Sequence, residues 1–476
     1  MLWRLIYDED LAEAAYLIGC QRTGEAIVFD PERDVDRYIA LAASHSLRIT
    51  AVAETHIHAD FLSGARELAE QVGAHVYVSG LGGPEWQSKW VGPYRHTLLK
   101  DGDTFAVGNI HFRALHTPGH TPEHMVYLVE DRGGGADEPM GVVTGDFMFV
   151  GDLGRPDLLE SAAGQQGVAD GFAHDLHRSA SKFMSQPDHL QIWPAHGAGS
   201  ACGKALGAVP QSTMGYERRF NPMLRLVEDE QTFVRTILEG QPEPPTYFAR
   251  MKAWNRDGVP LLGKVPQPRR LAAGDIASAI DGRNVPVDCR RQPEFIRRHL
   301  PGSLWAPLGP AFLMAIGSYV EPTDPIVLIC EEAQLDRQVR ALVRIGLDRI
   351  EAWTDPATLT QHFESGGGHE SIPEIHVDEL AQRLESEPAL PLLDVRRASE
   401  ARAGAIDGAV NVAHTRLLDR LDEVPAGEPL HIHCLSGARS TMAAAALKRR
   451  GRSTVNVGGG FSAWQKGPGA GAAARS

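Results

Sequence analysis

Side chains that can bind a metal are concentrated in one short stretch, Glu54-Thr55-His56-Ile57-His58-Ala59-Asp60. An apolar run over 49–53 precedes it and a helical pattern over 65–72 follows it, so we expect a loop between a strand and a helix. Imidazole and carboxylate ligands suit zinc or non-haem iron better than calcium. Because a His-x-His motif alone is more often structural than metal-binding, the assignment depends on partners elsewhere in the chain.

Those partners follow the ends of three further predicted strands. His120, Asp146 and His196 each lie a few residues after an apolar run with strand-like composition. Side chains at strand ends can meet along one edge of a sheet, whereas each alone would be read as a cap or a satisfied core residue. The shared placement of six residues predicts a metal site, and these are His56, His58, Asp60, His120, Asp146 and His196.

The chain that positions these residues has 476 amino acids, which is enough for about three domains. Its hydrophobic content of 43% is typical of a globular protein, and its formal net charge of -14 argues against a nucleic-acid partner. No apolar run is long enough to span a membrane, and residues 1–19 read as a strand hairpin rather than a signal peptide. Five cysteines without a C-x-x-C pair indicate free thiols in a reducing, cytoplasmic protein.

The order His-x-His-x-Asp, Pro-Gly-His, Gly-Asp and Ala-His over the first half of the chain resembles the metallo-β-lactamase fold. That resemblance implies an αββα sandwich, in which two sheets are flanked by helices. Within the superfamily, the stretches 54–60, 116–121, 144–146 and 154–157 are most similar to persulfide dioxygenases.

One departure separates this chain from the binuclear hydrolases of the superfamily, such as glyoxalase II. Those enzymes follow the aspartate with a histidine that binds a second metal, whereas this chain has Phe61, which cannot ligate. A second ion would keep only Asp60, His196 and a shared Asp146. The resemblance to persulfide dioxygenases instead implies one Fe(II) per chain, with three coordination positions open for substrate sulfur and O2.

Carried over from that family, the residues divide into iron ligands and residues that orient the ligands. The implied iron ligands are His56, His120 and Asp146, and the orienting residues are His58, Asp60 and His196.

Three residues beyond the ligands have an open role. Arg155 and Asp157 lie where the family keeps residues near the substrate, but they could equally form a structural ion pair. Cys202 has small neighbours and resembles a cysteine of dioxygenases fused to sulfurtransferases, which implies sulfur handling, although a buried structural thiol is the alternative. We expect Lys204 to lower the pKa of the Cys202 thiol.

The second half of the chain repeats itself after a proline-rich linker that carries aromatic residues. Val287-Asp288-Cys289-Arg290 is similar to Leu393-Asp394-Val395-Arg396, and the two aspartates, 288 and 394, lie 106 positions apart. Alternating strand and helix patterns in each copy predict two small α/β domains with open parallel sheets.

The second copy contains the loop Cys434-Leu435-Ser436-Gly437-Ala438-Arg439-Ser440 and resembles rhodanese. Backbone N–H groups of such a loop and the positive end of the following helix favour a thiolate, and Arg439 adds a cation. Gly437 can supply a positive φ angle. We therefore expect Cys434 to be the sulfur-transfer nucleophile, within an anion-binding loop formed by Gly437, Arg439 and Ser440.

The first copy has Cys330-Glu331-Glu332-Ala333-Gln334-Leu335-Asp336 at the equivalent place. Glycine and arginine are both missing, and acidic residues raise the pKa of a neighbouring thiol and repel anionic sulfur donors. We expect a degenerate rhodanese that serves as a spacer or docking surface.

These observations predict an α/β and α+β multidomain protein. A metallo-β-lactamase-like domain over 1–240 and a linker over 241–270 precede a degenerate rhodanese over 271–362 and an active rhodanese over 373–470. The resemblance implies oxidation of a low-molecular-weight persulfide by O2 to sulfite, coupled to sulfur transfer that gives thiosulfate. We expect a homo-oligomer with no nucleic-acid or membrane partner. The alternatives are a glyoxalase-II-like zinc thioester hydrolase and a non-enzymatic sulfane-sulfur carrier.

Overall fold

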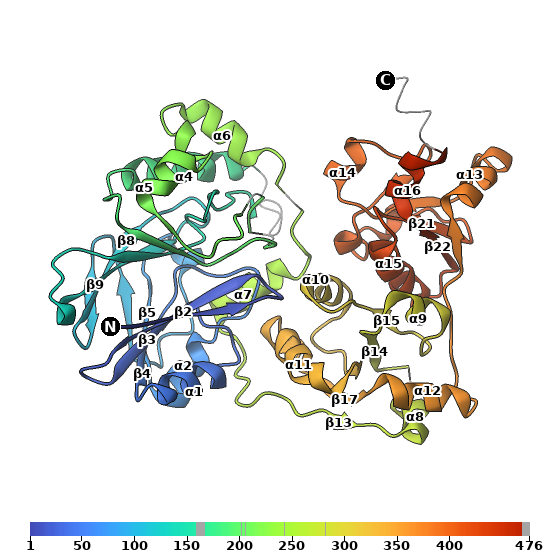
Figure 1. Ribbon diagram of the computed structural model, residues 1–476, viewed down its shortest axis with the longest axis horizontal. Coiled ribbons are helices and arrows are strands. Elements are labelled where there is room, and N and C mark those ends of the chain that lie inside the picture. Colours follow the sequence, from blue (N-terminus) through green and yellow to red (C-terminus); the bar gives the residue numbers. More distant parts are fainter. Residues whose placement is uncertain (159–166, 201, 205, 242, 281, 469–476) are drawn as a thin grey trace. The chain divides into compact units, whose positions relative to one another are not determined.

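The computed structural model describes residues 1–158, 167–200, 202–204, 206–241, 243–280 and 282–468. The chain forms two compact units (Figure 1). The first contains Met1–Val265 and Val343–Gly346, and the second contains Pro266–Leu342 and Leu347–Ser476. Each unit is described separately below.

Two six-stranded sheets make up the centre of the first unit. In the first sheet β1, β2 and β3 pair antiparallel, and β3 to β6 pair parallel. Its strands, in sheet order, are β1 (Leu2–Asp8), β2 (Glu13–Cys20), β3 (Glu25–Phe29), β4 (Arg48–Ala53), β5 (His75–Ser79) and β6 (His96–Leu99). The second sheet has the order β12 (Ser212–Thr213), β11 (Gln191–Pro194), β10 (Gly141–Gly145), β9 (Met125–Asp131), β8 (Ile110–His116) and β7 (Thr104–Val107).

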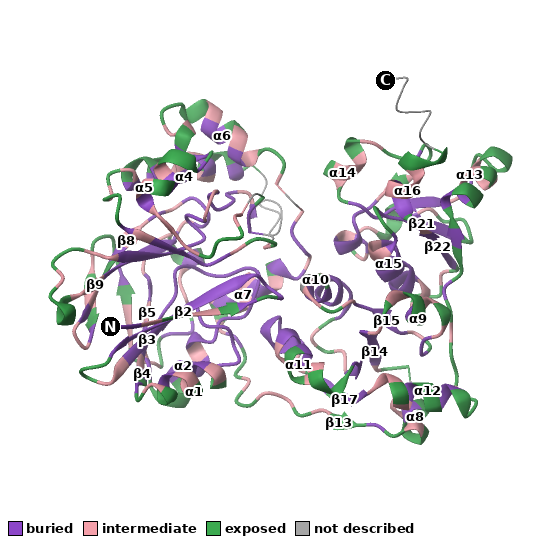
Figure 2. Cartoon of the chain, viewed as in Figure 1, coloured by how far each residue is buried: buried purple, intermediate pink, exposed green. Residues whose placement is uncertain are grey.

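The two sheets pack face to face through a buried apolar layer. Tyr16 and Phe29 of the first sheet belong to the same core cluster as Phe112, Tyr127 and Trp193 of the second. Alternation places one face of each strand in this layer, as in β8, where every second residue from Ile110 to Ala114 is buried. Figure 2 shows the buried strands in purple.

Helices cover the outer face of each sheet. The first sheet packs against α1 (Asp36–Ser44) and α2 (Ala65–Val72) through one apolar cluster. The second packs against α4 (Ala169–Phe183), α5 (Met214–Phe220) and α6 (Glu230–Leu238) through another. This layering confirms the predicted αββα sandwich.

The segment after α6 is part of the first unit rather than a free tether. It forms the helix α7 (Phe248–Asp257), in which Phe248 and Met251 are buried, and Tyr247 just before it is buried as well. The aromatic side chains of the linker therefore pack on the sandwich, in agreement with their expected role.

The second unit contains two five-stranded sheets with equivalent strand order and parallel pairing throughout. The first has the order β13 (Arg269–Arg270), β17 (Ile350–Thr354), β16 (Ile326–Ile329), β14 (Val285–Asp288) and β15 (Leu304–Trp305). The second has the order β18 (Glu374–His376), β22 (Thr454–Gly458), β21 (Leu430–His433), β19 (Leu392–Asp394) and β20 (Val410–Asn411). The equal order confirms the predicted internal repeat.

Each of these sheets is accompanied by helices of its own copy. The first copy has α8 (Ile276–Ala279), α9 (Gln292–Arg297), α10 (Pro310–Tyr319), α11 (Leu335–Arg344) and α12 (Pro356–Glu364). The second copy has α13 (Val377–Ser386), α14 (Ala398–Arg402), α15 (Ala438–Lys448) and α16 (Gly460–Lys466).

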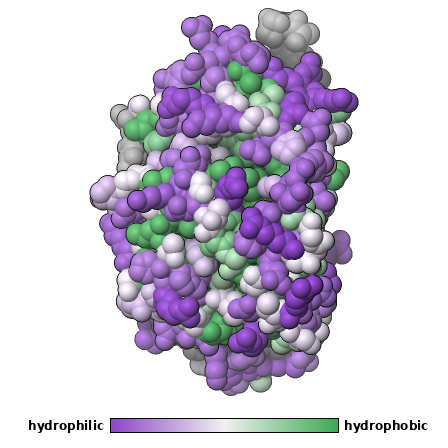
Figure 3. Space-filling view, turned by 90° about the vertical axis from the view of Figure 1, so that its left-hand side faces the viewer, coloured by the Kyte–Doolittle hydropathy of each residue, from purple (hydrophilic) through white to green (hydrophobic). Residues whose placement is uncertain are grey.

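In the described part of the chain, no helix is both long and apolar enough to cross a membrane. Hydrophilic residues dominate the face in Figure 3, and apolar side chains lie in smaller groups between them.

Candidate metal centre and sulfur-transfer loop

Three strand ends of the sandwich bring His56, His120 and Asp146 together. His56 follows β4, His120 follows β8, and Asp146 follows β10. One ligand atom from each lies within 4.8 Å of the others, and all three residues are buried. The Nε2 atom of His120 is 3.4 Å from Oδ2 of Asp146. The residues that the sequence predicted as iron ligands therefore converge on one small volume.

Hydrogen bonds at Nδ1 hold both histidines with Nε2 directed to this volume. Nδ1 of His120 lies 2.9 Å from the backbone oxygen of Arg155, which can only accept, so Nδ1 carries the proton. Nδ1 of His56 lies 3.0 Å from the Thr55 hydroxyl, which itself donates to Oδ2 of Asp30 at 2.9 Å. In both rings the Nε2 lone pair is left for a metal.

Asp146 is positioned through its backbone, which leaves its carboxylate available. Its N–H donates to Nε2 of His124 at 3.1 Å, and His124 in turn contacts the Thr117 hydroxyl through Nδ1 at 2.9 Å. A Cβ at Gly154 would overlap the Asp146 carbonyl oxygen, so glycine is required for this close approach.

Both carboxylate oxygens of Asp146 are buried and have no hydrogen-bond donor among the described residues. Burial alone would raise the pKa of Asp146, but His196 and His120 hold it well below its ordinary value. A buried carboxylate without donors beside two imidazole lone pairs fits a cation, and two nitrogens with one oxygen suit Fe(II) or zinc.

His58 lies in a separate cluster beside the triad. Its Nε2 is 3.1 Å from Oδ1 of Asp30 and 3.3 Å from Oε2 of Glu54, and its ring is tilted against that of Phe61 with centroids 4.4 Å apart. Burial would lower the pKa of His58, but the two carboxylates raise it well above its usual value. The Nε2 atom of His58 therefore contacts carboxylates, while its ring lies against that of His56 in the triad, with centroids 4.2 Å apart.

Asp60 and His196 form a second group next to the triad, and Cys202 completes it. Nε2 of His196 is 3.3 Å from both Oδ2 of Asp60 and Oδ1 of Asp146. Asp60, His196 and Cys202 each offer a ligand atom within 4.8 Å of the others. Asp60 and His196 are the residues that the sequence offers for a second ion, and the structure adds the Cys202 thiol to them.

The predicted effect of Lys204 on Cys202 is wrong. Burial raises the pKa of the Cys202 thiol, and Asp60 raises it further. The ammonium of Lys204 donates instead to the backbone oxygens of Thr236 and Glu239, at 2.5 and 2.9 Å. Because the thiolate is both the nucleophile and the metal-binding form, a thiol that stays protonated is poorly suited to either role.

Arg155 and Asp157 form a bidentate ion pair, with 2.8 Å from Nε to Oδ1 and 2.7 Å from Nη2 to Oδ2. Arg155 is buried, and its carbonyl oxygen is the one that orients His120. Arg155 therefore contacts His120 through its backbone, whereas its guanidinium contacts Asp157.

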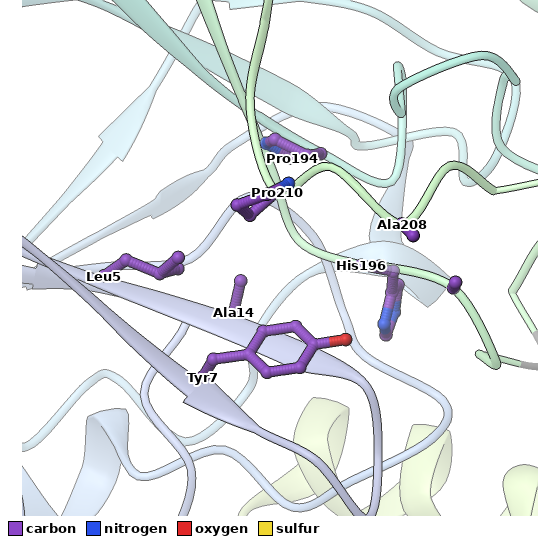
Figure 4. Close-up of a pocket in the computed structure, with 9 residues that line it drawn as sticks. Leu5, Tyr7, Ala14, Pro194, His196, Ala208 and Pro210 are labelled. Carbon is purple, nitrogen blue, oxygen red and sulfur yellow. The ribbon is translucent and has the colours of Figure 1, made fainter.

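A pocket of about 360 Å³ lies beside His196 (Figure 4). Apart from His196 and Tyr7, the described residues that line it are apolar or glycine, namely Leu5, Ala14, Pro194, Gly197, Ala198, Ala208 and Pro210. The histidine that faces Asp146 thus also borders a space for an uncharged group.

The structure adds supporting residues that sequence reasoning missed. Asn255 of α7 donates to the backbone oxygens of His58 and Phe61 at 2.8 and 2.7 Å, and it accepts from the N–H of Ser63 at 2.9 Å. The aromatic residues of the linker were the one signal that this distant segment packs on the sandwich. Nothing in the sequence paired Asn255 with the loop.

In the second copy, the loop after β21 curls around Cys434 as predicted. The N–H of Gly437 donates to its Sγ at 3.1 Å, and the Ser440 hydroxyl lies 3.6 Å from it. Gly437 has a φ of 110°, which is costly for other residues. Arg439 pairs with Glu400 at 2.6 and 2.8 Å.

In the first copy, Cys330 follows β16 at the equivalent position. Burial and then the neighbouring Glu331 raise the pKa of its thiol to about 12. This confirms the predicted effect of the acidic loop, although burial is the larger cause.

Comparisons with known proteins agree with this architecture. Residues 9–196 match the metallo-beta-lactamase superfamily, and residues 376–467 match the rhodanese-like domain. A crystal structure of a metallo-beta-lactamase from Staphylococcus aureus matches this chain with 38% sequence identity and a TM-score of 0.67. The match covers 75% of this chain and 99% of the Staphylococcus aureus chain.

Two curated relatives cover the first half of the chain. Persulfide dioxygenase ETHE1 of Bos taurus is 28% identical, over 50% of this chain and 80% of its own length. A probable metallo-hydrolase of Burkholderia pseudomallei is 27% identical, over 55% of this chain and 93% of its own length. With its sandwich, its buried cluster of metal-binding residue types and its cysteine loop, the chain belongs to the metallo-beta-lactamase superfamily and carries a rhodanese-like domain over residues 376–467.

Proposed function

We propose that this protein oxidises a low-molecular-weight persulfide with O2 to sulfite at a single Fe(II), and that Cys434 transfers sulfane sulfur to sulfite to give thiosulfate. The observation that carries the proposal is the buried group of His56, His120 and Asp146, with Phe61 where binuclear hydrolases have a histidine. The similarity to a persulfide dioxygenase supports it. The biological role would be sulfide detoxification.

Fe(II) bound by this group would supply open coordination positions and redox chemistry, and the persulfide sulfur would be the net source of the electrons that reduce O2. The overall reaction balances as RSSH + O2 + H2O giving RSH, sulfite and two protons. His56 and His120 would hold the ion through Nε2, because their Nδ1 atoms already have partners. Asp60 and His196 border the same volume and would orient the substrate and the Asp146 carboxylate.

The pocket beside His196 would receive the organic part of the persulfide. Its apolar walls favour a small uncharged substituent, and they keep bulk water away from the sulfur. The ion pair between Arg155 and Asp157 would hold the backbone oxygen of Arg155 in place, where it accepts from Nδ1 of His120.

At the second site, the Cys434 thiolate would attack the outer sulfur of a persulfide. The new sulfur–sulfur bond forms on Cys434 as the bond to the parent thiolate breaks. Sulfite then takes the outer sulfur, which gives thiosulfate and regenerates the Cys434 thiolate. Gly437 and Ser440 would stabilise the negative charge on sulfur. Because both sites are on one chain, sulfite reaches Cys434 at a raised effective concentration.

A reducing, cytoplasmic setting would suit this chemistry. All five cysteines are free thiols, and the proposed sulfur acceptor has to stay reduced.

Metal analysis combined with oxygen uptake tests the first half of the proposal. The purified protein should contain about one iron per chain and consume O2 when a persulfide is added. His120→Ala should abolish oxygen uptake and lower the iron content while Cys434 stays reactive to alkylation. His189→Ala, which removes an exposed histidine of the same unit, is the matched control and should keep both.

The group Asp60, His196 and Cys202 supports one alternative, a zinc hydrolase with a second ion. Two zinc ions per chain together with thioester hydrolysis would replace the dioxygenase proposal with this one. Iron-free protein that still carries persulfide sulfur on Cys434 would favour a sulfur carrier.

A further inference from the structure

We propose that Gln292 of the first rhodanese copy is a positioning residue for Cys434, because it frees the Ser440 hydroxyl to donate to the sulfur. The first copy would then complete the sulfur-transfer loop of the second rather than act as a spacer alone. This inference rests on the proposed role of Cys434.

Gln292 is the first residue of α9, and its side chain reaches the loop that follows β21. The amide Nε2 donates to the backbone oxygen of Gly437 at 2.9 Å and to the hydroxyl of Thr441 at 2.6 Å. One amide nitrogen has two protons, so both contacts are satisfied at once. Gly437, whose N–H donates to the cysteine sulfur, is thereby held from its carbonyl side as well.

The carbonyl oxygen of Gly437 has more donors than it can accept. Besides Gln292, the hydroxyls of Ser440 and Thr441 lie 3.0 and 2.9 Å from it, and the N–H of Thr441 lies 3.2 Å from it. A carbonyl oxygen has two lone pairs, so two of these four donors are left without a full hydrogen bond there.

Ser440 is the donor with an alternative acceptor. Its hydroxyl is 3.6 Å from Sγ of Cys434, and it has only one proton to donate. When Gln292 and Thr441 occupy the Gly437 carbonyl, the Ser440 proton is available to the sulfur. Without the Gln292 amide, Ser440 turns to the carbonyl, and the negative charge on sulfur loses a donor.

The repeat explains why the donor comes from the first copy. The residue 106 positions after Gln292 is Ala398, the first residue of α14 in the second copy, and alanine has no donor in its side chain. Gln292 is only partly exposed, and Gly437 and Thr441 are buried, so water does not readily replace the amide.

A double-mutant cycle read out by alkylation tests this mechanism. We expect Gln292→Met, which keeps the side-chain length, to slow iodoacetamide labelling of Cys434 roughly three- to tenfold at neutral pH. The pH of half-maximal labelling should rise in the same variant. Ser440→Ala should cause a similar loss, and the double variant should be no slower than Ser440→Ala alone.

Arg449→Met is the matched control. Arg449 links the same two copies by donating to the backbone oxygens of Gly302 and Asn284 at 2.8 and 3.3 Å, at the opposite end of α15 from the cysteine loop. It should leave the labelling rate within about twofold. An equal loss in Arg449→Met would show that Gln292 only holds the copies together.

Additive losses in the double variant, or no loss in Gln292→Met, would also overturn the proposal. Labelling measures the thiol itself, so its outcome is separate from the proposed function. If the labelling rates follow the expected pattern but the unchanged protein forms no thiosulfate, the proposed function of Cys434 is rejected and the positioning role of Gln292 is retained.

Discussion

The two rhodanese-like copies share a buried ion pair and differ in the loop that surrounds the cysteine. Asp288 and Arg290 pair in the first copy at 2.7 Å, and Asp394 and Arg396 pair in the second at 2.5 Å. Both arginines also donate to a backbone oxygen eight residues downstream, at 2.8 Å in each copy. The pair closes the same turn after the same strand in both copies, which identifies it as part of the scaffold.

The loop that follows β16 in the first copy and the loop that follows β21 in the second copy carry different residue types around the cysteine. In the second copy, Gly437 donates to Cys434, and Arg439 and Ser440 lie beside it. In the first copy, Ala333, Leu335 and Asp336 occupy these three positions. The scaffold residues are thus kept where the fold needs them, whereas the donors to sulfur are present in one copy only. Substitution of the ion-pair residues should therefore affect stability, and substitution of the loop residues should affect the reactivity of the cysteine.

The largest effect should come from removing the nucleophile of the second copy. Cys434→Ser should lower thiosulfate formation at least ~10³-fold, because only the transfer step needs that thiolate. Oxygen uptake should continue, and sulfite should accumulate in place of thiosulfate. Ion chromatography of both anions distinguishes the outcomes. Unchanged thiosulfate would move the transfer step to Cys202 or Cys330.

Breaking the shared ion pair should affect the two copies alike. Asp288→Asn and Asp394→Asn each leave a buried guanidinium without its carboxylate, which should cost about 3 kcal/mol of local stability. Amide hydrogen exchange should quicken over β14 and β16 for the first change, and over β19 and β21 for the second. A large effect in one copy alone would contradict the common scaffold role.

Removal of the Arg439 cation from the second copy should have a smaller effect, on the rate of sulfur transfer. Arg439→Met should slow sulfur transfer about tenfold, close to 1.4 kcal/mol, because a positive charge near the sulfur is lost. Glu400 then loses its partner, so the double variant Arg439→Met with Glu400→Gln is the informative control. If this double variant recovered full activity, the arginine would serve only to neutralise Glu400. Stopped-flow measurement of persulfide consumption supplies the rates.

The sequence predicts a structural feature well when the residues that form it are neighbours in the chain. The loops around His56 and Cys434 are continuous motifs, and their residue types alone indicate a metal site and an anion-binding loop. The repeat is visible in matching stretches such as those around Asp288 and Asp394, and the resemblance of the metal motifs to the metallo-β-lactamase fold implies the layered sandwich.

Contacts between distant segments had no such signal. Asn255 and Gln292 reach loops that lie about 150 to 200 positions away in the chain, and nothing in the sequence pairs them. The direction of a long side chain is equally hidden, which is why Lys204 was assigned to Cys202 but contacts Thr236 and Glu239. The side chains that cluster in the structure are thus predictable from local motifs, whereas the residues that hold them in place are not.

The smallest effect is expected at the first copy, where Cys330 should be almost inert. With a pKa of about 12, only about one thiol in 10⁴ is ionised at pH 8, and labelling should rise about tenfold for each pH unit up to that value. A limiting amount of iodoacetamide at neutral pH should therefore label Cys434 well before Cys330, as mass spectrometry of the two peptides would show.

Replacement of Cys330 should have almost no effect on catalysis. Cys330→Ser should leave thiosulfate formation within about twofold of the unchanged protein, a barrier change well under ~1 kcal/mol. The substitution keeps the size of the side chain, so α11 and the strand before it should stay folded. A persulfide trapped on Cys330 during turnover, together with a large loss of rate in this variant, would show that both copies transfer sulfur. The contrast between their loops would then reflect different sulfur donors rather than the presence and absence of activity.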